Sequence, residues 1–198
     1  MMWPFGSGKR NLGKLLATGQ LTSYGSGAGV DDGAYQKGIA KRYTILTTGQ
    51  YSGNTNITIN SKTDAHSNNC VFDDHTGLMW SRYQSASVGP SSIGTLPWTT
   101  NGSAEGIFEY TAAANAASLG GYTDWRVPNI YELFSIMDRE APTGIPNSTA
   151  FPSWQTSTST HSSTTVPATI ANDEIMGGGG NPTANVKTTN YYCILVRG

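Results

Sequence analysis

Apolar residues recur at helical spacing before residue 119. The stretch Ala104–Leu119 contains no proline, and its apolar side chains are three or four positions apart, at Ile107, Tyr110, Ala114 and Ala117. Such positions lie on one face of an α-helix, so the pattern predicts a helix packed against a core. Gly120 and Gly121 follow directly, and glycine readily adopts the left-handed conformation that ends many helices. We therefore expect the helix to end there.

A second helix is predicted directly after Pro128. Proline lacks a backbone donor and favours an extended conformation for Val127 before it. Asn129 then caps a helix expected over residues 130–138, and Glu132, three positions later, completes a capping box. The two predicted helices thus meet at a rigid corner.

Asp124, Trp125 and Arg126 lie in the short link between these helices. An acid, a large ring and a guanidinium at such a corner favour a buried joint that is pinned by an ion pair and by stacking. We interpret the three residues as structural rather than catalytic, because charged pairs on short links commonly fix geometry.

Period-two patterns predict strands before the helices. Residues 42–60 contain Ile57 and Ile59 alternating with polar residues, which predicts a two-stranded ribbon, and residues 61–69 follow as a polar loop. Residues 71–80 predict a hairpin, in which apolar runs that include the structural residue Trp80 flank the polar tip DDHTG. Adjacent acids and a histidine beside a glycine are typical of turn chemistry, so we assign His75 to the turn rather than to a metal site.

Strand-forming residues return in the last third of the chain. The runs 154–160 and 166–175, and the apolar and aromatic closing run 191–196, predict strands. Four successive glycines at 177–180 exclude a regular element there. Strands, then helices, then strands predict an α+β domain whose first and last strands lie near each other.

The N-terminal part of the chain differs from the rest. Residues 1–40 hold many glycines and no sustained period, so we expect residues 1–60 to form an extended arm with the ribbon, suited to contacts with other subunits. Residues 61–198 would form the compact domain. No signal peptide is recognised, and no apolar segment reaches the roughly 18 residues that a membrane helix needs, so membrane insertion is not expected.

Composition narrows the classes of partner. Charged residues make up 13% of the chain, and the formal net charge is -1. No basic stripe is present, so nucleic acid is not expected as a partner. Polar but weakly charged surfaces are common on extracellular and virion proteins.

Cys70 and Cys193 are the two cysteines of the chain. Two cysteines are too few for a disulfide framework and lack the spacing of metal ligands, so no metal or other cofactor is expected. Each lies in a strand-like run, which leaves two readings: a disulfide between neighbouring strands, or two buried thiols.

Three stretches resemble one known family: VFDDHTGLMW at Val71–Trp80, LGGYTDWRVPNIYEL at Leu119–Leu133, and YYCILVRG at Tyr191–Gly198. They are similar to the Lcl C-terminal-like domain family over residues 68–198, and DDGAYQKG at Asp31–Gly38 resembles the leader before this domain in many members. The resemblance implies a C-type-lectin-like fold, with two helices flanking small antiparallel sheets and the N- and C-terminal strands paired. It also implies a binding role on bacterial surfaces or in phage proteins, including receptor-binding proteins diversified by reverse transcription.

The sequence departs from sugar-binding and catalytic patterns. Calcium-dependent lectins use Glu-Pro-Asn or Gln-Pro-Asp and Trp-Asn-Asp triplets, but Val127-Pro128-Asn129 lacks the acid and Ala171-Asn172-Asp173 lacks the tryptophan. Calcium-dependent sugar binding is therefore not expected. No Ser/His/Asp order, phosphate loop or HExxH motif is present, so we expect no enzymatic activity. A minor hypothesis is an enzyme with Asp124, His75 or His161 as acid–base groups.

The leading hypothesis is a non-enzymatic recognition module on the tail fibre, tail tip or capsid surface of a phage particle, with a bacterial surface adhesin as an alternative. Its partners would be a host-cell surface receptor, protein or glycan, and other virion proteins, within a homo-oligomer such as a trimer. We expect its contact surface to include Trp154, Thr156, Thr158, His161, Asn172, Asp173, Asn181, Asn185 and Asn190. A second hypothesis is architectural: the arm clasps adjacent subunits and the domain decorates the assembly.

Overall fold

The structure is a computed structural model. It describes residues 16–18, 20, 22–23, 38–51, 54–60, 62–67, 70–85, 93–98, 105–140, 146–152, 154–168 and 172–198. Most of the predicted arm, the leader-like residues 31–37 and Ala171 lie outside the described residues. None of the described helices is both long and apolar enough to cross a membrane.

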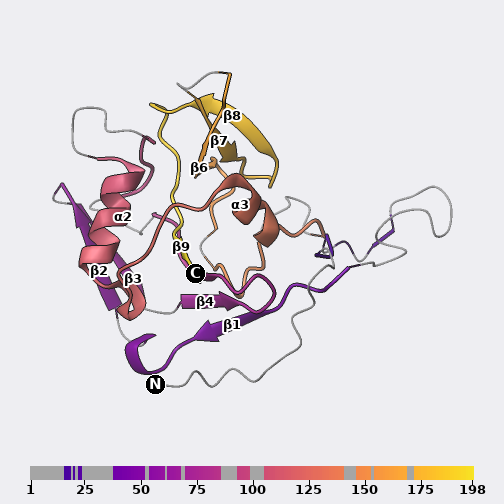
Figure 1. The fold of residues 1–198 in the computed structure, drawn as a ribbon, viewed down its shortest axis with the longest axis horizontal. Helices are drawn as coiled ribbons and strands as arrows, with labels where there is room; N and C mark the ends of the chain where they lie inside the picture. Colours follow the sequence, from indigo (N-terminus) through magenta and orange to yellow (C-terminus); the bar gives the residue numbers. More distant parts are fainter. Residues whose placement is uncertain are drawn as a thin grey trace.

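A four-stranded antiparallel sheet forms the centre of the domain, in the order β1-β4-β5-β9 (Figure 1). Its strands are β1 (Tyr43–Leu46), β4 (Cys70–Asp73), β5 (Met79–Ser81) and β9 (Val196–Arg197). The predicted hairpin is confirmed as β4 and β5. The last strand does lie in the same sheet as the first, but the expected direct pairing of the terminal strands is not formed, because β4 and β5 lie between them.

Neighbouring residues of this sheet enter two different cores. One core takes Cys70, Met79, Cys193 and Leu195, and the other takes Val71, Trp80, Ile194 and Val196. Successive side chains of a strand point to opposite faces, so both faces of the sheet are covered. A sheet covered on both faces explains why its segments CVF, LMW and CILV are unbroken apolar runs.

The first core lies under a ribbon and a helix. The ribbon consists of β2 (Asn54–Ile59) and β3 (Lys62–Ser67), and the helix is α2 (Ile107–Ala116). The predicted ribbon within residues 42–60 and the predicted loop over 61–69 are therefore wrong. Residues 43–46 pair with β4 instead, and the second strand of the ribbon lies where the loop was expected.

The first helix ends earlier than predicted, at Ala116, and the first left-handed residue after it is Ser118, with a φ of 53°. Helix α2 is followed by the short 3-10 helix η2 (Leu119–Gly121), in which Gly120 and Gly121 have positive φ angles of 59° and 82°. A second 3-10 helix, η1 (Gly49–Tyr51), lies against it, and a Cβ on Gly121 would come within 3.1 Å of the Gln50 side chain. The positive φ therefore favours glycine at residue 121, and any other residue there would also have to displace the Gln50 side chain.

The second core lies under helix α3 (Ile130–Ile136) and a three-stranded sheet. That sheet contains β6 (Thr160–Thr165), β7 (Asn172–Met176) and β8 (Pro182–Val186) in this order. The predicted strand runs are displaced along the chain, and β8 was not predicted. The four glycines form the turn between β7 and β8. In Figure 1 this sheet and α3 lie together, apart from α2 and its ribbon.

Described residues of the N-terminal part contact the segment that follows α3. Thr18 accepts a hydrogen bond from the Arg139 backbone at 2.9 Å, and Thr22 donates to the Glu140 carboxylate at 2.6 Å. Lys41 donates to the Met137 carbonyl oxygen. These segments of the predicted arm therefore pack on the domain of their own chain.

Candidate recognition groove

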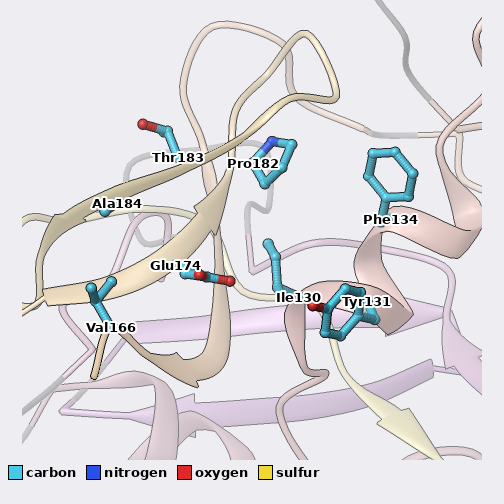
Figure 2. A pocket seen from close by; sticks show the side chains of 8 residues that line it. All are labelled: Ile130, Tyr131, Phe134, Val166, Glu174, Pro182, Thr183 and Ala184. Atoms are coloured by element: carbon cyan, nitrogen blue, oxygen red, sulfur yellow. The ribbon is translucent and has the colours of Figure 1, made fainter. Parts of the chain in front are cut away.

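A groove of about 460 Å³ separates α3 from the β6–β7–β8 sheet (Figure 2). Its lining residues come from both sides: Ile130, Tyr131, Phe134, Val166, Glu174, Pro182, Thr183 and Ala184. Most of these side chains are apolar, and the volume falls in the range of small-ligand and peptide-side-chain sites. We take this groove as the candidate functional site.

The helix side of the groove exposes two aromatic rings. Ile130, Leu133 and Ile136 are buried because they lie on the face of α3 that meets the second core. Tyr131 and Phe134, three positions apart, lie on the neighbouring face and remain 83% and 45% exposed. The short helix thus buries one face and presents a second apolar face to solvent.

The strand side of the groove continues this apolar surface. Pro182, Ala184 and Val186 alternate along β8 and therefore lie on one face of the sheet. All three are exposed, and Val186 retains 46% of its accessible surface. We call these three side chains the β8 row. The seven-residue helix α3 packs against β6 and β7 and leaves the β8 row uncovered.

The open edge of β8 is largely closed to another strand. Gly177 donates to the Asn181 carbonyl at 2.9 Å, so residues 177 and 181 form a hydrogen-bonded pair. Hydrogen-bonded and non-hydrogen-bonded pairs alternate along an antiparallel ladder. The N–H and C=O groups of the β8 row therefore point away from β7. Pro182 has no N–H to offer. The Val186 N–H donates to Asn185 Oδ1 at 2.7 Å, and the Val186 carbonyl accepts from Thr189 at 2.9 Å. A partner would therefore meet the side chains of the β8 row rather than its backbone.

One charged side chain, Glu174, lines the groove, and a second, Arg139, lies beside the lining residue Phe134. The Glu174 carboxylate projects between β7 and α3 (Figure 2), and no hydrogen bond or ion pair joins it to a described residue. Arg139 lies near Phe134, with its guanidinium carbon 5.1 Å from the ring centroid. It also donates to Asn181 Oδ1 at 3.1 Å and to the Gly180 carbonyl at 2.9 Å, so this cation is already engaged.

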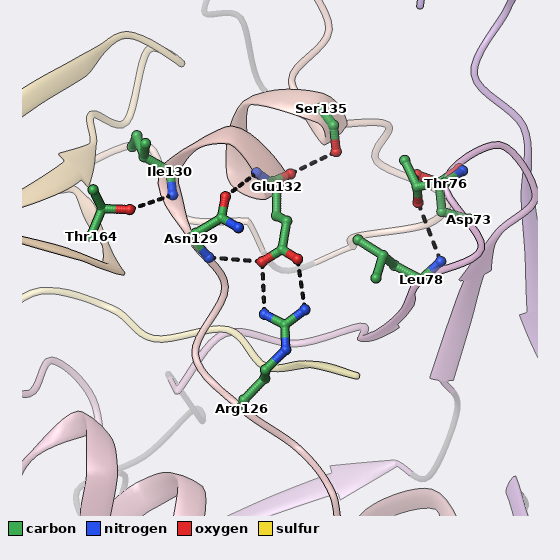
Figure 3. Close-up of polar contacts among 9 residues, drawn as sticks. All are labelled: Asp73, Thr76, Leu78, Arg126, Asn129, Ile130, Glu132, Ser135 and Thr164. Atoms are coloured by element: carbon green, nitrogen blue, oxygen red, sulfur yellow. Dashed lines mark hydrogen bonds and ion pairs between the residues drawn. The ribbon is translucent and has the colours of Figure 1, made fainter. Parts of the chain in front are cut away.

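The predicted corner orients α3 and hence the groove (Figure 3). Asn129 Oδ1 accepts from the Glu132 N–H at 2.9 Å, and Glu132 Oε2 accepts from the Asn129 N–H at 2.8 Å, which confirms the capping box. Arg126 donates two hydrogen bonds to the same carboxylate, at 2.8 and 2.6 Å. Burial opposes ionisation of Glu132, but the bonds from Arg126 and Asn129 outweigh it and lower the pKa of Glu132.

The corner also joins the two sheets. Arg126 exchanges backbone hydrogen bonds of 2.9 Å with Val196 of the central sheet, and the Pro128 carbonyl accepts from Ser163 of β6 at 2.8 Å. The Ile130 N–H donates to Thr164 Oγ1 at 3.0 Å (Figure 3). The first turn of α3 is thereby fixed to both walls of the second core.

The ion pairs at the corner differ from the expected one. Asp124 pairs with Arg197 rather than with Arg126, at 2.6 and 2.9 Å, and these bonds lower the pKa of Asp124. The Arg197 guanidinium stacks 3.7 Å from the centroid of Tyr122. Trp125 is the buried ring of the corner, and its indole donates to the Leu119 carbonyl at 2.8 Å. Each of the three residues thus has contacts within the fold, and the partner of Asp124 comes from distant sequence.

His161 and Asp173 form a pair with no exposed surface. His161 Nδ1 lies 2.6 Å from Asp173 Oδ2, and Nε2 lies 2.8 Å from the Leu96 carbonyl oxygen. A carbonyl only accepts, so Nε2 carries a proton, and the contact at Nδ1 requires one more proton between the two side chains. The pair is therefore neutral overall and fixes the Leu96 loop to β6 and β7. The expected role of these two residues in an exposed contact surface does not fit their burial.

The other predicted contact residues are spread over this half of the domain. Trp154 and Thr158 are half-buried, Thr156 is exposed, and none of them lines the groove. Trp154 packs against the second core. The Thr156 backbone carbonyl occupies the place where Gly178 would carry a Cβ, so this segment packs against the glycine turn.

The predicted asparagines also surround the groove rather than line it. Asn181 and Asn190 are exposed, and Asn172 is half-buried. Asn185 donates to the Tyr191 hydroxyl at 2.5 Å, so it has a structural partner. The predicted contact residues thus lie in the same half of the domain as the candidate groove, and they do not include Tyr131, Phe134 or the β8 row.

Cys70 and Cys193 are free and buried, which decides between the two readings left open by the sequence. Burial raises the pKa of Cys70 to about 12 and raises that of Cys193 above its usual range. Thiols in this state are poor nucleophiles. Both cysteines are core residues.

His75 lies in the β4–β5 turn, as predicted. The Asp73 carboxylate accepts the His75 N–H at 2.9 Å and the Thr76 hydroxyl at 2.8 Å, which closes the turn. The described residues contain no group of three or more His, Cys, Asp or Glu side chains able to hold a metal ion. The three candidate acid–base residues lie in separate places: Asp124 in the corner, His75 in this turn and His161 in the buried pair. None of them lines the groove.

Comparison with known proteins agrees with the motifs of the sequence. The model of the Lcl C-terminal domain family matches residues 69–197. The chain belongs to this family. No curated protein and no solved structure matches the chain. The Lcl C-terminal domain thus includes both helices, the groove and the closing strand.

Replacing Glu132 tests the corner. Glu132→Ala removes the carboxylate that accepts from the Asn129 N–H and pairs with Arg126, while Asn129 Oδ1 can still cap the helix. We therefore expect it to lower the free energy of unfolding by about 1.5 kcal/mol. Glu132→Gln keeps the cap and should lose about 0.5 kcal/mol. Because the folded-state pKa of Glu132 is lowered, its charge-dependent contribution is present above about pH 4.3 and is lost as the pH falls. Urea unfolding at several pH values measures this. A Glu132→Ala variant with the same free energy of unfolding as the unmodified protein would contradict the prediction.

The buried pair predicts unequal effects of two substitutions. His161→Phe leaves the Asp173 carboxyl buried without its partner, so we expect a loss of about 3–5 kcal/mol. In Asp173→Asn the amide N–H can still donate to Nδ1 while Nε2 donates to Leu96, so the loss should be about 1 kcal/mol. Equilibrium unfolding measures both variants. Equal losses would show that the shared proton is not what holds the pair.

Proposed function

We propose that this chain is a non-enzymatic recognition module whose contact surface is the groove between α3 and β8. One observation carries the proposal. The described residues include four exposed large apolar side chains, and three of them, Tyr131, Phe134 and Val186, gather at this groove or its β8 row. A cluster of uncovered apolar side chains on a packed domain is typical of an interaction site.

We further propose that the domain has a C-type-lectin-like fold and is displayed on a phage particle, at a tail fibre, tail tip or capsid surface. The α+β architecture, with two helices and small antiparallel sheets, is compatible with that fold. The partner would be a host-cell surface receptor. Membership of the Lcl C-terminal domain family supports this proposal through the resemblance to surface and phage proteins.

An architectural role has less support. The described parts of the arm, at Thr18 and Thr22, bind Arg139 and Glu140 of their own chain. None of these four residues lines the groove. A surface adhesin of a bacterium would use the same groove, so it differs from the phage proposal in setting and not in mechanism.

The groove predicts which variants lose attachment. Tyr131→Ser removes an exposed ring, and Ala184→Gln places a long polar side chain on the groove wall, so we expect each to reduce binding to host cells at least about tenfold. Phe108→Ser is the matched control, because Phe108 is also exposed, at 44%, but lies outside the groove. Flow cytometry of labelled protein on a panel of bacterial strains measures the effect. Equal binding by all four proteins would contradict the proposed surface.

A further inference from the structure

The lining of the groove favours one class of occupant. Glu174 and Thr183 supply its polar side-chain groups besides the Tyr131 hydroxyl, and the other five lining side chains are hydrocarbon. A sugar carries a hydroxyl on most of its carbons and loses affinity when these are buried without partners. Apolar side chains lose nothing on the same surface. The lining therefore fits a protein segment better than a glycan.

The carboxylate of Glu174 favours a ligand that carries a positive charge. Its carboxylate is half-buried in the groove beside Ile130, and it has no partner among the described residues. An apolar ligand would cover this carboxylate and remove its water, which is costly unless a cation replaces the water. Two described cations from the segments next to α3 and β8 are engaged elsewhere. Arg139 binds Asn181 and Gly180, and Lys187 lies over Trp98 and donates to Thr165 at 3.0 Å. Since no described cation pairs with Glu174, we infer that the cation comes with the ligand.

The closed edge of β8 sets the mode of docking. Pro182 and Val186 offer few backbone partners, so a peptide cannot extend the sheet by a regular ladder. Its side chains must lie across the β8 row and against the exposed rings of Tyr131 and Phe134. A lysine or arginine suits this path, because its aliphatic stem packs on apolar surface while its charged end reaches Glu174.

We propose that the groove binds an exposed segment of a partner protein that presents one lysine or arginine between apolar residues. This inference rests on the proposed function, because it names the class of partner for the same groove. Glu174 is then the residue that determines specificity for the cation. Tyr131, Phe134 and the β8 row supply contact area that is insensitive to charge.

The test uses three probes and amide chemical shifts of the isotopically labelled full chain. The probes are the capped peptide Pro-Phe-Lys-Leu-Pro, the same peptide with glutamate in place of lysine, and maltotriose. We expect the lysine peptide to shift the resonances of Tyr131, Phe134 and Ala184 and to bind about tenfold more tightly than the glutamate peptide. Raised salt should reduce that difference.

Matched variants separate charge from contact area. Glu174→Gln should weaken the lysine peptide about tenfold and leave the glutamate peptide unchanged or improved. Tyr131→Ser should weaken both peptides equally, and Phe108→Ser should change neither. Well-dispersed spectra of each variant verify that the fold is intact.

The outcomes distinguish this inference from the proposed function. Equal affinity for both peptides, or groove shifts caused by maltotriose and not by the lysine peptide, would overturn the cationic-segment inference and keep the groove as the contact surface. Shifts confined to residues outside the groove, or no shift with any probe, would overturn both. An affinity of the lysine peptide that is unchanged in Glu174→Gln would likewise reject Glu174 as the specificity residue.

Discussion

The fold depends on the closing segment Tyr191–Arg197, to which parts of both halves of the domain bind. β5 pairs with it along one edge, and Arg126 exchanges two backbone hydrogen bonds with it along the other. The Leu96 loop and β6 at His161 bind its first residues. Since its alternate side chains enter two cores, this segment also connects the hydrophobic interiors. Its partners all come from earlier in the chain, so neither core is complete until the last residues are in place.

The parts of this fold that the sequence predicts well are those that local chemistry determines. Asn129 with Glu132 begins α3 as predicted, because a capping box acts within a few residues. The first helix ends at Ala116, before the glycines that were expected to end it. Strand pairing is not local. The alternation at Ile57 correctly indicates a strand, but nothing near it shows that the partner is residues 62–67, or that residues 43–46 leave the ribbon to pair with β4.

The candidate site shows the same limit. His161 and Asp173 look like adaptable contact residues in a polar loop, yet they pair with each other in the interior, and a polar residue buried with its partner cannot be recognised from one sequence. The alternation of proline, alanine and valine in residues 182–186 was a readable signal for a strand with one apolar face. That α3 would be too short to cover this face, and that Tyr131 would face the same groove, follows only from the packing of helix on sheet.

An exposed apolar strand at the edge of a sheet has two opposing consequences. Its side chains can recognise a partner, but its unpaired backbone can also join any other strand, because ladder hydrogen bonds do not depend on sequence. In β8, pairing with another strand is limited at two places. Pro182 lacks an N–H donor, and the N–H and carbonyl groups of Val186 are already hydrogen-bonded to Asn185 and Thr189. Contact with β8 must then use side chains, whose fit depends on shape and on the charge of Glu174. In the proposed recognition role, the closed backbone limits pairing with unrelated strands and leaves the choice of partner to the side chains.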